Sequence, residues 1–350
     1  MRGQADERTR KKKRKQSGRS LVLLLVLLGA AMSAVLLGWR YYLRQIQQDG
    51  IAGYASDQTY DRHYVMIADD SSSLLWQDIY QNAKRAAVEC GAYLELLNDW
   101  ESVEYELTDY MNIAVASKVD GIIVKPDGTV KMRQAINAAE AAGIPVITVL
   151  EDDSASDRTS FVGVNSYQLG TVYGTQILSC VDADTRQITV LLNRSDAGKD
   201  LVYKQLRATV QEGLARGQTI GINSLTNTPG SFFGAEELLR NLLQDEAQRP
   251  DILVCINETD SECAYYAMVD YNQVGSVKLI GYYQTERMLA AVQKGIVPIV
   301  ITLDTAQLGT CSIEALEEYY SMGYVSSYFS VDLDIITQEN VQQFLETETS

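Results

Sequence analysis

Short runs of consecutive apolar residues alternate with amphipathic stretches along most of the chain. From residue 64 onward the apolar runs, such as Gly121–Val124 and Pro145–Val149, are short, with four to six residues each. The stretches between them have helical spacing, and several end at a glycine, such as Gly91 and Gly143. A continuous apolar run is typical of a strand covered on both faces, and a glycine after a helical period is typical of a helix end. The pattern therefore predicts alternating strands and helices.

The predicted elements suit two parallel sheets. The expected strands are 64–68, 93–97, 121–124, 145–149, 161–164, 187–192, 221–225, 252–256, 278–281 and 297–301. The expected helices are 74–90, 103–117, 130–142, 167–179, 201–216, 233–243, 261–269, 286–294 and 306–320. Strict alternation implies parallel strands with right-handed crossovers. Because about ten strands are many for one open twisted sheet, we expect two lobes with a cleft between them. Ligands in such sheets bind beyond the carboxyl ends of the strands, so the loops that follow the strands are the places to search.

One apolar run near the start has a different character. Leu21–Leu37 is uncharged and has about the length that spans a bilayer as a helix. Residues 1–19 hold nine Lys and Arg against two acids, and the positive-inside rule keeps such a tail in the cytoplasm and exports the chain after Trp39. A signal peptide cleaved near Ala31–Ser33 is the alternative, but the run is longer than a usual signal segment. No cysteine follows it directly, so a lipid-modified N-terminal cysteine is excluded. We expect an uncleaved anchor.

Composition excludes several function classes. The formal net charge is −16, and after residue 19 the chain has 21 basic and 44 acidic residues, which argues against nucleic acid as a partner. The five cysteines are far apart and are expected to be free, buried thiols. His63 is the only histidine and falls at the border of the predicted stalk, so His-based metal sites and a Ser-His-Asp triad are not available. No phosphate-binding glycine motif occurs. We expect neither a cofactor nor enzymatic activity. The alternative to a binding protein is an enzyme, for instance a glycosidase that uses two carboxylates in the cleft.

Several segments carry a family resemblance. In order along the chain they are VDGIIVKP (119–126), AGIPVITV (142–149), FVGVNSYQLG (161–170), PDILVCINE (250–258) and VKLIGYYQT (277–285). Together they resemble the type I periplasmic binding proteins of the ribose and galactose class, over nearly all of residues 64–335. The resemblance implies an α/β fold of two Rossmann-like lobes with parallel sheets, joined by three crossovers near Asn165, Thr302–Asp304 and Tyr324–Ser327.

The resemblance also divides the chain. We expect a cytoplasmic basic tail (1–20), a transmembrane anchor or signal (21–39) and a stalk (40–62). Lobe one would hold 63–164 plus 304–325, and lobe two 165–303 plus 326–345. The membrane span stands where the repressors of this family carry their DNA-binding head, so a repressor is excluded.

The resemblance places ligand contacts in the loops after the strands. The expected ligand-binding residues are Ser72, Ser73, Trp76, Lys125, Asp127, Glu151, Arg194, Asn257, Glu258, Tyr282, Tyr283, Thr302 and Asp304. Of the aromatic residues that the family usually offers after the first strand, only Trp76 is kept. Tyr282 and Tyr283 follow Gly281 where the family has Phe-Asp, so the aspartate expected to hold sugar hydroxyls is missing.

Each candidate also has a structural interpretation. Trp76 either stacks on a ring of the ligand or anchors the core at the start of a helix. Lys125 and Arg194 either bind a carboxylate or phosphate of the ligand or form salt bridges with Asp127 and Asp196. The acids and amides hydrogen-bond ligand hydroxyls or an amine, or are solvated loop residues.

The sequence therefore predicts an extracytoplasmic solute-binding receptor in the cell membrane. It would capture a small polar ligand, a sugar or sugar-like molecule, between its lobes. The partner would be an ABC permease for uptake or a membrane histidine kinase for signalling, and the fixed span favours signalling. The alternative is a degenerate binding protein without a small ligand that acts through protein contacts.

Overall fold

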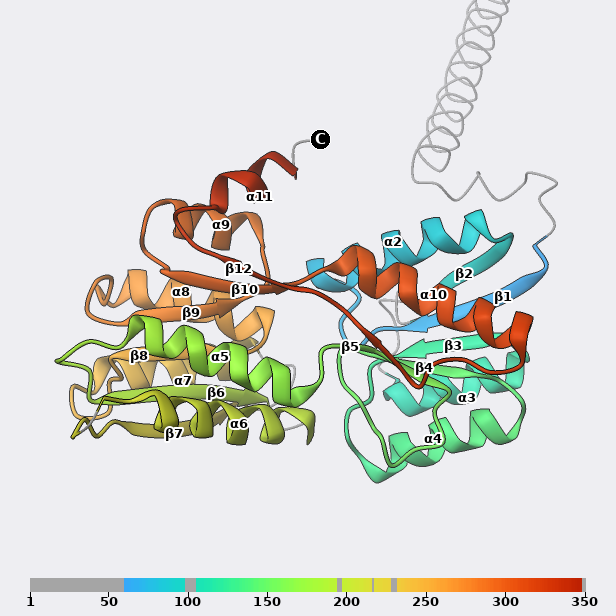
Figure 1. The fold of residues 1–350 in the computed structure, drawn as a ribbon, viewed down its shortest axis with the longest axis horizontal. Coiled ribbons are helices and arrows are strands. Elements are labelled where there is room, and N and C mark those ends of the chain that lie inside the picture. Colours follow the sequence, from blue (N-terminus) through green and yellow to red (C-terminus); the bar gives the residue numbers. More distant parts are fainter. Residues whose placement is uncertain (1–59, 98–104, 194–196, 216, 228–231, 348–350) are drawn as a thin grey trace, which may run out of the picture. The chain divides into compact units, whose positions relative to one another are not determined.

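The computed structural model describes residues 60–97, 105–193, 197–215, 217–227 and 232–347. The predicted tail, anchor and nearly all of the stalk lie outside these ranges. Within the described part, no helix is both long enough and apolar enough to cross a membrane. The described residues form two six-stranded sheets with helices on their faces (Figure 1).

The first sheet has the strand order β11-β5-β4-β3-β1-β2, and each neighbouring pair is parallel. Three of its interior strands, β3, β4 and β5, are buried at every position, because helices cover both faces. The helices α3 and α4 pack on one face, and α2 and α10 lie side by side on the other. The elements are β1 (Arg62–Ile67), α2 (Leu74–Glu89), β2 (Ala92–Leu97), α3 (Leu107–Ser117), β3 (Gly121–Val124), α4 (Val130–Ala141), β4 (Val146–Val149), β5 (Ser160–Gly163), α10 (Thr305–Met322) and β11 (Tyr328–Ser330).

The second sheet has the order β12-β10-β9-β8-β6-β7. Only its edge strand β12 is antiparallel to its neighbour. The elements are α5 (Ser166–Cys180), β6 (Gln187–Asn193), α6 (Ala197–Gly213), β7 (Gly221–Asn227), α7 (Phe232–Gln244), β8 (Ile252–Cys255), α8 (Glu258–Asp270), β9 (Lys278–Tyr282), α9 (Glu286–Gln293), β10 (Ile299–Leu303), β12 (Leu333–Ile336) and α11 (Val341–Thr347). The two sheets with their helices are the two lobes of the protein.

The chain passes between the lobes three times: after β5, after β10 and after β11. Backbone hydrogen bonds join these passages. Val331 N donates to Gly163 O at 3.1 Å, and Asp304 N donates to Asp332 O at 3.1 Å. The three passages thus run together as one connection, the arrangement that a hinge requires.

The third passage does not lie where the sequence predicted it. We expected it near Tyr324–Ser327, but the chain first adds the three-residue strand β11 to the first lobe and crosses between Ser330 and Leu333. The strand β11 is a half-exposed edge strand without an apolar run, so no hydrophobic period marks it. The short strand β12 and the seven-residue helix α11 were also not predicted.

Two smaller expectations also need correction. His63 lies in β1 and not in the stalk, and its Nε2 is 3.0 Å from Glu95 Oε2. All five cysteines are free, and Cys180, Cys255 and Cys263 are buried as expected, but Cys90 is exposed and Cys311 is half-buried. Cys90 is exposed because it is the C-cap of α2, at the end of the helix.

Candidate ligand-binding site

The carboxyl ends of the two sheets meet at the first turn of α2. Ser73 is the N-cap of this helix, and its Oγ donates to Glu258 Oε2 at 2.6 Å. Leu74 N donates to the other carboxylate oxygen at 3.3 Å. Glu258 follows β8 of the second lobe. Its negative charge therefore satisfies the free N–H groups at the positive end of a helix in the first lobe.

A second contact between the lobes lies further along α2. The Tyr283 hydroxyl, which follows β9, donates to Asp78 Oδ2 of α2. Tyr283 is fully buried, and burial together with Asp78 raises the pKa of its hydroxyl. Its φ of 67° lies in the left-handed region, which costs a non-glycine residue about 1 kcal/mol or more. The surrounding contacts therefore hold Tyr283 in a strained conformation at the meeting point of the lobes.

A charged network lies beside these contacts in the first lobe. Asp69 comes directly after β1, and its carboxylate accepts from Trp76 Nε1. Lys125, which follows the neighbouring strand β3, places Nζ 2.5 Å from Asp69 Oδ2. The sequence offered Asp127 as the partner of Lys125, but Asp127 instead accepts from Thr129 N at 2.8 Å in its own turn. Trp76 is 2% exposed and belongs to the hydrophobic core, so its indole is fixed by packing as well as by Asp69.

Thr302 is a buried polar residue near the carboxyl end of β10. It is 1% exposed, and its Oγ1 finds no hydrogen-bond partner among the described residues. A buried hydroxyl without a partner costs about 1–3 kcal/mol, so such groups are rare and call for an explanation. A ligand hydroxyl or a bound water would provide the missing bond.

Thr302→Val tests this hydroxyl. Because the change removes an unsatisfied polar group and keeps the branched shape, we expect the free energy of unfolding of the ligand-free protein to stay equal or to rise, by up to about 2 kcal/mol. Urea unfolding measures the effect. Thr148→Val is the matched control: Thr148 is also fully buried, but its Oγ1 donates to Ser160 O at 3.4 Å, so its removal should lower the stability. A clear loss of stability in Thr302→Val would show that its hydroxyl is already paired.

Other expected residues hold their own loops in shape. Asn257 caps α8, since its Oδ1 accepts from Asp260 N at 2.8 Å, and Asp304 caps α10 by accepting from Gln307 N at 2.9 Å. The Asn257 cap also explains why α8 begins at Glu258 and not at Ser261.

The remaining candidate residues do not share a common role. Ser72 is exposed and donates to Asp70 Oδ1 at 2.6 Å. Tyr282 is 8% exposed, and its N–H donates to Ser261 Oγ at 2.8 Å. Glu151 is half-buried after β4. Arg194 lies outside the described residues.

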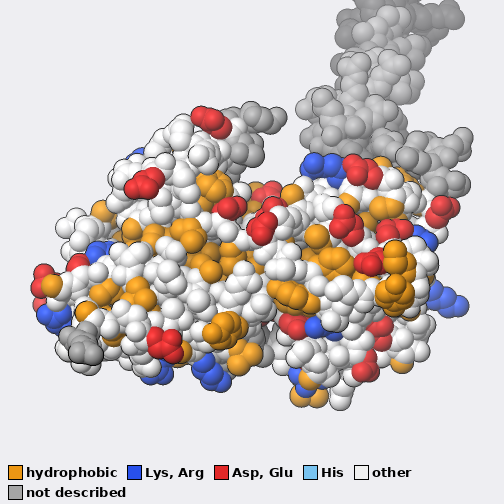
Figure 2. All heavy atoms as spheres, in the orientation of Figure 1, with side chains coloured by type: hydrophobic (Ala, Val, Ile, Leu, Met, Phe, Trp, Pro, Cys, Tyr) orange, Lys and Arg blue, Asp and Glu red, His pale blue; other side chains and the backbone are white. Residues whose placement is uncertain are grey.

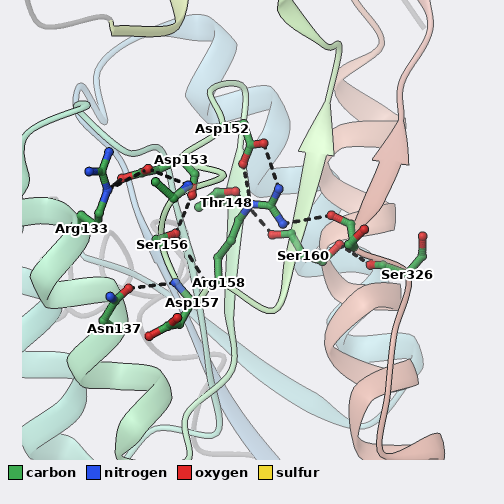
Figure 3. Close-up of polar contacts among 12 residues, drawn as sticks. Arg133, Asn137, Thr148, Asp152, Asp153, Ser156, Asp157, Arg158, Ser160 and Ser326 are labelled. Atoms are coloured by element: carbon green, nitrogen blue, oxygen red, sulfur yellow. Dashed lines mark hydrogen bonds and ion pairs between the residues drawn. The ribbon is translucent and has the colours of Figure 1, made fainter.

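The acids that follow β4 are engaged in ion pairs (Figure 3). Arg133 Nε lies 2.9 Å from Asp153 Oδ2, and the Arg158 guanidinium binds Asp152 and donates to Ser327 O at 3.0 Å. Asp152 and Asp153 therefore tie their loop to α4 and to the start of β11. Asp153 is only 6% exposed, so it is not a solvated loop charge.

Sequence reasoning missed some residues at this edge. Asp69 and Asp78 are the partners of candidate residues, and no motif marks them. Phe232 and Phe233, at the start of α7 in the second lobe, are 48% and 73% exposed. Two consecutive phenylalanines after a predicted strand could have indicated an apolar surface that binds a ring of the ligand.

Two doubly wound lobes, joined by three passages and meeting at the carboxyl ends of their strands, define a class of proteins that bind small molecules between their lobes. Residues 64–322 match the model of the periplasmic binding protein domain, so the chain belongs to this family. The resemblance seen in the sequence is thereby confirmed. The family consists of solute-binding proteins.

Individual relatives are distant. The chain is 22% identical over 257 residues to a putative rhizopine-binding protein of Rhizobium meliloti, which covers 71% of this chain and 80% of that protein. The structure is similar to that of GanP, a glucose-galactose binding protein from Geobacillus stearothermophilus, with a TM-score of 0.73 and 18% identity over 81% of this chain and 99% of that one. It is also similar to XylFII in the XylFII-LytSN complex, with a TM-score of 0.70 and 20% identity over 80% of this chain and 99% of that one. These similarities agree with the two-lobed fold.

Proposed function

We propose that this protein is a receptor that binds a small, polyhydroxylated, sugar-like molecule between its two lobes. The observation that carries the proposal is the meeting of the two sheets at their carboxyl ends. Side chains that follow β1 and β3 come together there with side chains that follow β8 and β9. A ligand held at this place contacts both lobes and so stabilises their closed arrangement.

The chemistry at this place favours an uncharged or cationic ligand. Carboxylates, hydroxyls and amides hydrogen-bond well to sugar hydroxyls. The charge of Lys125 is matched by Asp69, and the N-terminus of α2 is already occupied by Glu258. Acidic side chains are also spread over both lobes on the face shown in Figure 2. An anionic ligand would meet repulsion, whereas relatives such as GanP bind neutral sugars.

We further propose that the binding domain lies outside the cytoplasm, held by a single membrane helix within residues 21–39. The basic tail before this segment would stay in the cytoplasm. The partner would be a membrane histidine kinase or an ABC permease. In the XylFII-LytSN complex a protein of the same fold is assembled with a second protein, which supports a protein partner for this chain as well.

Thermal-shift screening of the full chain in detergent tests the ligand class. The panel should hold sugars, polyols, nucleosides and amino acids. A ligand at 100 times its dissociation constant adds about 2.7 kcal/mol, which raises the melting temperature by roughly 5 °C or more. We expect such a shift from a sugar or polyol, and a smaller shift in Thr302→Val than in the control Thr148→Val. A hit among amino acids or nucleosides alone would contradict the sugar-like class.

One observation favours a second candidate function. Ser73, Glu258 and Tyr283, which were expected to contact a ligand, make direct contacts with the opposite lobe. A protein whose lobes hold each other in this way can act through protein contacts without a small ligand. The absence of any shift across the whole panel would favour this second function.

A further inference from the structure

Two side-chain contacts tie α2 of the first lobe to the second lobe, and both are made by the protein alone. Near the start of the helix, Ser73 Oγ and Leu74 N donate to the Glu258 carboxylate at 2.6 and 3.3 Å. Five residues after Ser73, about 7.5 Å further along the helix, Asp78 accepts from the Tyr283 hydroxyl. The partners are separated by 185 and 205 positions in the sequence. We call these four side chains, Ser73, Asp78, Glu258 and Tyr283, the latch.

The latch contacts are shielded from water. Tyr283 is fully buried, and Glu258 and Ser73 are half-buried. Burial raises the pKa of Glu258 in spite of the donors that surround it, which agrees with a carboxylate removed from solvent. Hydrogen bonds to a charged group are stronger than neutral ones, and shielding from water strengthens them further.

Apolar packing accompanies the hydrogen bonds. Trp76 and Ile79 of α2 belong to the same continuous core cluster as Tyr282 and Tyr283 of the second lobe. All four of these side chains are at most 8% exposed. Opening the lobes at α2 therefore breaks two charged hydrogen-bonded contacts and also exposes part of this core.

We propose that the latch keeps the two lobes closed on each other in the absence of any ligand. This goes beyond ligand capture. A bound ligand usually holds two such lobes together by contacting both, whereas here Glu258 and Tyr283 make the contacts between the lobes themselves. A ligand would then enter through transient opening and would find a largely preformed site. A partner that recognises the closed form would find it in the unliganded protein too.

Distance measurements between spin labels on the full chain test the latch. Cys90 of the first lobe is exposed and takes one label, and Lys294→Cys on the exposed C-cap of α9 takes the other. Cys311→Ser removes the half-buried thiol that would compete for label. Double electron–electron resonance without ligand should give one narrow distance for the intact latch. The double variant Glu258→Ala/Tyr283→Phe should give a longer or clearly broader distribution.

The control is Tyr203→Phe. Its hydroxyl donates to Ile222 O at 3.2 Å within the second lobe, so its loss should leave the distance between the lobes unchanged. Circular dichroism confirms that each variant is folded, and Tyr283→Phe alone serves if the double variant is not. A broad distribution in the intact protein would overturn the proposal, and so would a narrow one that the latch variants do not alter. Because no ligand is present, neither result depends on the proposed ligand binding.

Discussion

Gly309→Ala is expected to lower the free energy of unfolding by about 3 kcal/mol, because α10 and α2 touch backbone to backbone at this glycine. A Cβ atom on Gly309 would lie 2.5 Å from Ala83 N and 2.6 Å from Ile79 O. Neither backbone atom can move without displacing the helix, and overpacking of this kind costs about 1–3 kcal/mol or more. Urea unfolding measures the loss.

The matched control is Gly221→Ala at the start of β7. The nearest atom to a Cβ there is Arg186 O at 3.7 Å, an ordinary contact, so we expect little change or a small gain in stability. Because α2 carries Ser73, Trp76 and Asp78, Gly309→Ala should also weaken ligand binding. Equal stability of the two alanine variants would contradict the close packing of α2 on α10.

Asp69→Ala is expected to affect both stability and binding. The change leaves the buried Trp76 indole without this acceptor, which costs about 2 kcal/mol, and removes the carboxylate that Lys125 faces. The positive charge of Lys125, beside the proposed site, would then be less fully balanced by negative charge. We expect the dissociation constant of the best ligand from the screen to rise at least tenfold, which corresponds to about 1.4 kcal/mol. Calorimetric titration measures the affinity.

Asp69→Asn separates the two effects. The amide oxygen still accepts from Trp76, so most of the stability should return, while the charge that balances Lys125 stays absent. Ligand affinity should remain low. If Asp69→Asn restores full affinity, the charge of Asp69 has no part in binding, and the network is only structural.

Most of the fold could be predicted from local pattern. Strands such as Gly121–Val124 and Ile252–Cys255 are short, entirely apolar and followed by helical periods, and the structure has them at or next to the predicted bounds. Helix ends were predictable where a glycine marks them, as Gly91 does directly after the C-cap of α2. The two strands that were missed, β11 and β12, are half-exposed and hold three and four residues. Their position depends on pairing with distant strands, which no local period records.

For the candidate site, the sequence predicts which loops contribute side chains but not how these side chains pair. The sequence directed attention to the loops after the strands, and the structure has Ser73, Lys125, Glu258 and Tyr283 there. The partner of each side chain could not be predicted, because it comes from another part of the chain. Glu258 meets α2 across 185 positions, and Lys125 meets Asp69 across 56. Tertiary packing decides which polar groups pair with each other, and which, like the Thr302 hydroxyl, have no partner in the described part of the chain.

Hydrogen exchange of the full chain with and without the best ligand tests whether the ligand binds between the two lobes. If the ligand sits between the carboxyl ends of both sheets, backbone amides around 69–76 and 125–129 of the first lobe should exchange more slowly with the ligand bound. Amides around 256–261 and 282–285 of the second lobe should slow in the same sample. Protection confined to one lobe, or located away from these loops, would contradict ligand binding between the carboxyl ends of the two sheets.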